Sequence, residues 1–128
     1  MRTFNALSAR CPAREILSRV ADKWTVLVLS VLSGGTTRFN ELRRRVDGIT
    51  QKVLTDTLRD LERLGLVSRK VYAEVPPRVE YSLTPLGVSL VGLIDDVKLW
   101  VESHAPEVLK AQQRYETQKQ AAAARRPA

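Results

Sequence analysis

Five polar residues near the middle of the chain have side chains that can read DNA bases. Gln can pair with an adenine edge, Thr can hydrogen-bond a base or touch a thymine methyl, and Lys or Arg can reach guanine or phosphate. With Leu54 turned towards a core, helical spacing places Lys52, Asp56 and Arg59 on the opposite face, with Thr55 at its flank. The pattern predicts a base-reading set at the start of one helix: Thr50, Gln51, Lys52, Thr55 and Arg59.

The same helix face also fits an ordinary solvated surface. Asp56 lies four residues after Lys52 and three before Arg59, which are spacings at which surface ion pairs form. A carboxylate that faces phosphates needs a partner, and we expect Asp56 to pair with Arg59. This helix alone therefore leaves base reading and simple solvation both open.

Two short amphipathic helices are expected to position these residues. Phe39, Leu42 and Val46 form a narrow apolar stripe that predicts a first helix, and Asp47-Gly48 ends it. Thr50 stands where an N-cap is needed, before an apolar row made of Leu54, Leu58 and Leu61. Two such helices joined by a tight turn make a helix-turn-helix, whose second helix can enter a DNA major groove.

A β-hairpin is predicted directly after these helices, over residues 66–83. Two stretches alternate between apolar and polar residues, and Pro76-Pro77-Arg78 separates them. A hairpin in this place is a wing, and Arg78 at its tip is suited to a narrow, electronegative minor groove. The alternative is an ordinary loop with an ordinary surface arginine.

The remaining elements are expected to be helices. Pro12 begins a short helix that ends near Asp22. Residues 24–32 are apolar on almost all sides, which favours a central core helix, although their β-branched content also permits a strand.

Thr84-Pro85 caps a long apolar helix that we expect to end at Pro106, near His104, before a polar helix over residues 107–120. The wide apolar stripe of the long helix either packs into its own core or covers a second chain.

Composition limits the function classes. The 128 residues suffice for one domain, and the formal charge of +7 with a pI near 10.1 favours a polyanionic partner. One Cys and one His cannot form a metal cage, and there is no Gly-rich phosphate loop, so we expect no enzyme, metal or cofactor. No apolar run is long enough to span a membrane, which predicts a cytoplasmic protein. We expect flexible ends at residues 1–9 and 121–128 around a domain at 10–120.

Several motifs in this order resemble the HxlR-type regulators, winged-helix relatives of the MarR family, from Cys11 to about Trp100. They are Cys11-Pro12, Lys23-Trp24, Arg38-Phe39-Asn40-Glu41-Leu42-Arg43, Gly48-Ile49-Thr50-Gln51-Lys52-Val53-Leu54-Thr55 and Pro76-Pro77-Arg78-Val79-Glu80-Tyr81-Ser82-Leu83-Thr84. The resemblance implies a mainly α fold with a small β wing (α+β) and a bacterial homodimer joined through terminal helices. Such a dimer would bind an inverted-repeat operator in double-stranded DNA, usually as a repressor.

The resemblance also implies roles for single residues. The base-reading role falls on Thr50, Gln51, Lys52 and Thr55, and the minor-groove role falls on Arg78. Contacts to the DNA backbone are expected at three further residues, for which plain solvent exposure is the alternative: Arg38, Arg43 and Arg44. A winged-helix module that docks acidic proteins, without reading bases, is the other function that fits.

Cys11 is the expected site of regulation by an oxidant or a small electrophile. It lies at or beside the N-cap of the first helix, where the helix dipole and Arg10 and Arg14 favour a reactive thiolate. Some HxlR-type regulators resemble redox sensors with a cysteine in this position. The alternative is an inert thiol that is partly buried against the first helix.

Overall fold

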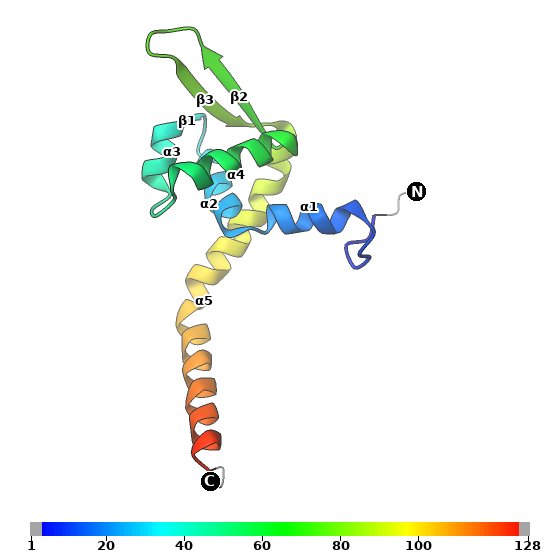
Figure 1. Ribbon diagram of the computed structural model, residues 1–128, viewed down its shortest axis with the longest axis vertical. Coiled ribbons are helices and arrows are strands. Elements are labelled where there is room, and N and C mark those ends of the chain that lie inside the picture. The colour runs from blue at the N-terminus through cyan, green and yellow to red at the C-terminus, as the bar shows by residue number, and fades with distance from the viewer. Residues whose placement is uncertain (1–3, 126–128) are drawn as a thin grey trace. The chain divides into compact units, whose positions relative to one another are not determined.

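The computed structural model describes residues 4–125, and the chain divides after Asp95 into two units. The first unit holds seven elements and the start of an eighth, labelled in Figure 1. They are α1 (Pro12–Val20), α2 (Lys23–Leu32), β1 (Thr37–Arg38), α3 (Phe39–Arg45), α4 (Gln51–Arg63), β2 (Val67–Tyr72), β3 (Arg78–Leu83) and α5 (Pro85–Ala124). The mainly α fold with a small β wing is confirmed.

α2 is the central core helix of the first unit, and the strand alternative for residues 24–32 is wrong. Val28 and Leu29 are fully buried, because a helix with apolar residues on most sides must be surrounded by other elements. The Asp22 carboxylate caps this helix and accepts the backbone N–H groups of Trp24 and Thr25 at 3.0 and 3.3 Å.

α3 and α4 form the predicted helix-turn-helix. The Thr50 hydroxyl caps α4 and accepts the backbone N–H of Val53 at 3.1 Å. The apolar row of α4 packs into the core with almost no exposed surface, so the opposite face is left for solvent or a ligand. That row consists of Leu54, Leu58 and Leu61.

The wing is an antiparallel hairpin of β2 and β3, visible in Figure 1 as the two green arrows. Its register pairs Val67 with Leu83 and Tyr72 with Arg78. The sheet has a third strand, β1, which the sequence did not predict; it pairs on the other side of β3, giving the order β1-β3-β2. Thr84 ties the end of the wing to the end of α4, because its hydroxyl donates to the Gly65 carbonyl at 2.6 Å.

α5 begins in the first unit and continues through the second as one helix to Ala124. The expected helix end at Pro106, and the separate helix over residues 107–120, are therefore wrong. Proline removes one backbone N–H, but the Glu102 carbonyl that loses this donor belongs to an exposed residue and can bind water. Ser103 and His104 also hydrogen-bond the carbonyls of Leu99 and Trp100, one turn earlier.

The ends of the chain were expected to be flexible. Residues 1–3 and 126–128 of those segments lie outside the described residues, and α5 runs into the second segment. Within residues 4–125, no helix combines the length and apolar character needed to cross a membrane.

Candidate nucleic-acid interface

The N-terminal tip of α4 presents polar side chains on a firmly anchored helix. Gln51 and Lys52 are exposed, and Thr55 is half-buried beside them. The backbone beneath them cannot shift easily, because Leu54 is completely buried and the Thr50 cap fixes the first turn. Gln51 carries both a hydrogen-bond donor and an acceptor, which is what an adenine edge requires.

Asp56 is paired with Lys52 rather than with Arg59, so the expected pairing is wrong. The Lys52 ammonium donates to Asp56 Oδ2 at 2.8 Å, across one helical turn. This hydrogen bond holds the pKa of Asp56 below its usual value, and the charges of Lys52 and Arg59 act in the same direction. Arg59 is exposed and has no ion-pair partner within the described part of the chain, so its charge remains available for a phosphate.

The arginines of β1 and α3 differ in how far they are engaged by carboxylates. Arg44 pairs with Glu41 on its own helix, and Arg38 lies 4.0 Å from Glu80 on β3. Arg43 is exposed and has no carboxylate within ion-pair distance among residues 4–125. Arg43 is therefore the freest of the three expected backbone contacts.

Arg78 is held more tightly than a wing-tip arginine was expected to be. Its guanidinium lies 3.8 Å from the ring centroid of Tyr72, its cross-strand partner. Glu74 approaches at 3.4 Å and Glu80 at 3.5 Å, and the side chain is only 28% exposed. Its Nε is buried without a hydrogen-bond partner in the described structure, since the approach of Glu80 lacks hydrogen-bond geometry.

Two further exposed cations, one on α3 and one on the wing strand β2, were not singled out from the sequence. Arg45 ends α3 beside Arg43 and Arg44, and Lys70 on β2 stands 4.9 Å from the ring centroid of Tyr72. The run of three arginines at residues 43–45 was the available signal for Arg45. For Lys70 the signal was its outward place in the alternating strand.

Cys11 occupies the N-cap of α1, as expected from the position of Pro12. The thiol is half-buried, and its Sγ accepts the backbone N–H of Asn5 at 3.2 Å. Arg14 donates to the carbonyls of Ala6 and Leu7 at 3.1 and 2.8 Å, which holds the preceding segment against the start of α1.

Residues 19–109 match the family model described as HxlR-like helix-turn-helix. The chain belongs to this family. The matched segment includes α2, the helix-turn-helix, the wing and the first part of α5. HxlR-like proteins are helix-turn-helix transcriptional regulators, so this chain is a DNA-binding regulator and not an enzyme.

Relatives and solved structures agree with membership of the HxlR-like family. The HTH-type transcriptional regulator YtfH of Escherichia coli is 44% identical over 109 residues, which cover 85% of this chain and 86% of YtfH. The structure of the transcriptional regulator YtfH from Salmonella typhimurium is 40% identical, with a TM-score of 0.83, and the match covers 87% and 99% of the two chains. The redox regulator HypR in its oxidized form is 44% identical, with a TM-score of 0.67 over 73% of this chain and 96% of HypR.

Proposed function

We propose that this protein is a homodimeric repressor that binds an inverted-repeat operator in double-stranded DNA. The observation that carries the proposal is the exposed polar tip of α4 on a buried leucine row. A bound dimer would cover promoter DNA and block polymerase, in the cytoplasm where the DNA lies. Two-fold symmetry requires an inverted repeat, and we expect its half-sites about one helical turn, roughly 10 bp, apart or slightly more.

We assign base reading to the tip of α4 and positioning to the arginines around it. Thr50, Gln51, Lys52 and Thr55 face the major groove in this proposal, with Arg59 further along the same helix. Phosphate contacts fall on Arg38, Arg43 and Arg44. The minor-groove role of Arg78 requires it to leave Glu74 or Glu80 when DNA arrives, because both carboxylates now hold it.

The dimer is supported by apolar surface that each unit leaves uncovered. In α1 no residue is buried, and Ile16 and Leu17 are 47% and 53% exposed. In the second unit Trp100 and Val101 of α5 are each more than half exposed. Large apolar side chains that are exposed in this way occur at protein interfaces. Sedimentation of a Leu17→Asp variant tests this, because an interface residue predicts a folded monomer and a surface residue predicts an unchanged dimer.

Regulation through Cys11 is part of the proposal. Its position at a helix N-cap and the likeness to the redox regulator HypR support it. In an oxidant such as diamide, two Cys11 thiolates from different chains would lose two electrons to form an intersubunit disulfide, and diamide would be reduced to its hydrazine. Operator binding should then change in the wild type and not in Cys11→Ser. Unchanged binding after proven modification would leave Cys11 a structural residue.

The decisive experiment measures binding to operator and random DNA at two salt concentrations for two matched variants. Gln51→Ala should lower operator affinity by about 1–3 kcal/mol and relax preference at particular base pairs. Arg43→Ala should weaken both DNAs alike and reduce the salt slope by about one unit. Equal loss on both DNAs for both variants would refute the placement of the base-reading tip.

The other candidate function, docking of an acidic protein, is judged by the same titration. A basic surface that only steers association predicts weak DNA binding without sequence preference. Genomic fragments selected by the protein would then share no inverted repeat, and the repressor proposal would fail.

A further inference from the structure

The outer face of the wing carries charged side chains around one aromatic ring. In the hairpin register Tyr72 pairs with Arg78 and Lys70 pairs with Glu80. Because side chains alternate along a strand, these four residues lie on one face of the sheet. Tyr81, the next residue after Glu80, points to the other face and is buried. The four therefore lie on the face of the wing that is turned away from the core.

The Tyr72 ring holds two cations at the tip of the wing. Arg78 Cζ lies 3.8 Å from the ring centroid and Lys70 Nζ lies 4.9 Å from it, and both distances are within the range of cation–π attraction. Tyr72 is the last residue of β2 and Arg78 is the first residue of β3, so the ring contact is made where the two strands meet the turn. The backbone register therefore fixes the ring beside Arg78.

The ring and the carboxylates hold the Arg78 guanidinium in different ways. A ring covers the face of the planar guanidinium, whereas the N–H donors lie in its plane and are not used by the ring. Glu74 lies 3.4 Å from Nη2 of Arg78, and Glu80 lies 3.5 Å from Nε. The Nε has no hydrogen-bond partner among residues 4–125, which is a costly state for a buried donor. Acceptors on DNA can therefore replace both carboxylates while the ring contact stays.

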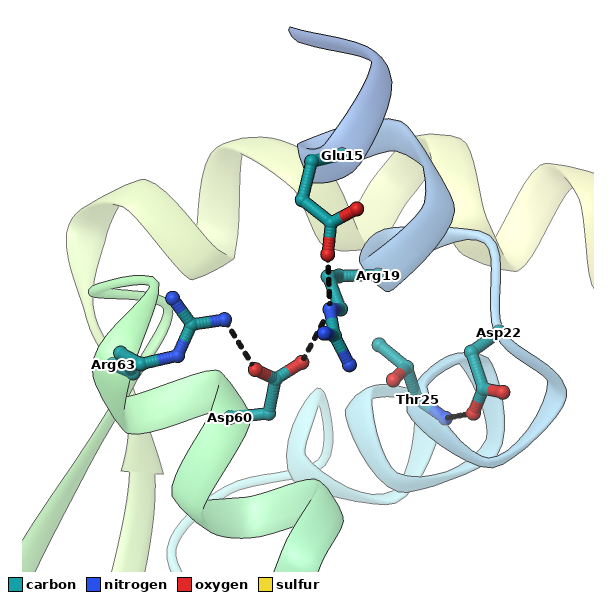
Figure 2. Close-up of polar contacts among 6 residues, drawn as sticks. All are labelled: Glu15, Arg19, Asp22, Thr25, Asp60 and Arg63. Carbon is teal, nitrogen blue, oxygen red and sulfur yellow. Dashed lines mark hydrogen bonds and ion pairs between the residues drawn. The ribbon is translucent and has the colours of Figure 1, made fainter. Parts of the chain in front are cut away.

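Arg19 of α1 shows the contrasting arrangement, in which carboxylates take the donors. Figure 2 shows Arg19 between Glu15 and Asp60, and its Nε donates to Glu15 at 2.9 Å and lies 3.9 Å from Asp60. An external phosphate would have to break a charge-assisted hydrogen bond to reach that donor. At Arg78 both carboxylates are 3.4 Å or more away and Nε is unpaired, so the side chain is fixed in direction while its donors remain available.

We infer that Tyr72 is a positioning residue, which keeps Arg78 directed into the minor groove while DNA replaces Glu74 and Glu80. This inference rests on the minor-groove role proposed for Arg78. In the complex Arg78 keeps its ring contact, and its Nε donates to an acceptor on the groove floor, N3 of adenine or O2 of thymine. Lys70, on the same ring, contacts a flanking phosphate. An arginine that is held in advance loses less rotamer freedom on binding, so Tyr72 strengthens the minor-groove contact.

Inosine-substituted DNA isolates the minor-groove contact. Inosine lacks the 2-amino group of guanine, so an inosine–cytosine pair has the minor-groove acceptors of an A·T pair and keeps the major-groove edge of a G·C pair. The probe is a duplex of one fixed mixed sequence, about three helical turns long, prepared once with guanine and once with inosine. We expect the wild type to bind the inosine duplex more tightly than the guanine duplex, and Arg78→Ala to lose this preference.

Variants on the two faces of β2 test the ring itself. Tyr72→Leu should reduce the inosine preference about two- to fivefold, whereas Tyr72→Phe keeps the ring and should keep the preference. Val71→Ala is the matched control, because Val71 is exposed and lies on the opposite face of β2, and it should also keep the preference. In an Arg78→Ala background, Tyr72→Leu should have no further effect on the preference. Full inosine preference in Tyr72→Leu would overturn the inference.

An NMR measurement on the wild type needs no variant to fold. Protons over an aromatic ring are shifted upfield, so the Arg78 side-chain signals should be shifted upfield in the free protein and stay so when the inosine duplex saturates it. Loss of this shift on binding would mean that Arg78 leaves Tyr72, which would refute the inference and leave the minor-groove role of Arg78 in place. Absence of any inosine preference in the wild type would refute that role and, with it, the inference.

Discussion

Gly87 lies where the start of α5 meets the turn after α4, and an added methyl group has no room there. A Cβ atom on Gly87 would lie 2.2 Å from the Leu66 carbonyl oxygen and 3.2 Å from Leu83 Cδ2. The Leu66 carbonyl cannot rotate away, because it also accepts the backbone N–H of Thr84 at 3.0 Å. Gly87→Ala must therefore push α5 away from the end of α4 by about 1.2 Å to restore an ordinary contact of 3.4 Å.

The magnitude follows from two opposing effects. Overpacking against backbone costs about 2–3 kcal/mol, near the upper part of the usual range. Alanine recovers about 1 kcal/mol over glycine within a helix. The net expectation is a loss of about 1–2 kcal/mol in the free energy of unfolding.

Gly92 provides the matched control within α5, because its Cβ would meet nothing within 4 Å. Gly92→Ala should therefore gain about 0.5–1 kcal/mol from helix propensity alone.

Urea unfolding at one fixed protein concentration measures both variants, since the stability of the proposed dimer would depend on concentration. The two midpoints should move in opposite directions from the wild type. If Gly87→Ala were as stable as Gly92→Ala, the close approach of α5 to Leu66 would be refuted.

Three further predictions concern the electrostatics. The hydrogen bond from Lys52 lowers the pKa of Asp56 in the folded state. The ionised Asp56 side chain therefore stabilises the fold at neutral pH, and this stabilisation is lost as the pH falls below 3.8. The urea midpoint of Asp56→Asn should lack this part of the decrease at acid pH. Burial, with the Glu62 charge, raises the pKa of Tyr81 above 10, so stability should fall as the pH rises beyond 10 in the wild type and less in Tyr81→Phe. Glu80→Gln should raise random-DNA affinity about two- to fivefold in a low-salt gel shift, because it frees Arg38 and removes one of the two carboxylates that hold Arg78. Glu107→Gln, at an exposed residue of the second unit with no ion pair in the described chain, should not.

Most of the fold could be predicted because its signals are local. The helix start at Thr50 is indicated by the apolar row that follows it within a few residues. The two strands of the hairpin are indicated by the alternation on either side of Pro76-Pro77. β1 has no such signal, since it is two residues long and exists only through pairing with residues 80 and 81. Pro106 predicted a helix end because proline removes one backbone hydrogen bond. The helix tolerates this loss, since the Glu102 carbonyl belongs to an exposed residue and can bind water.

Sequence alone indicates the residue types of the candidate site and does not decide how they pair. Lys52 and Arg59 were both within reach of Asp56, and helical spacing alone does not decide between partners at three and four residues. The restraint on Arg78 depends on Tyr72, which the hairpin register brings beside it, and on Glu80, two residues further along the same strand.

The strand order β1-β3-β2 bears on the protein's behaviour at high concentration. It leaves the outer edge of β2 without a neighbouring strand in the described chain, and such an edge is a template for another molecule's backbone. The middle of that edge carries Arg69 and Lys70, both exposed. Two antiparallel copies would bring these like charges together, so they discourage edge-to-edge aggregation, and this protection should weaken as salt screens them.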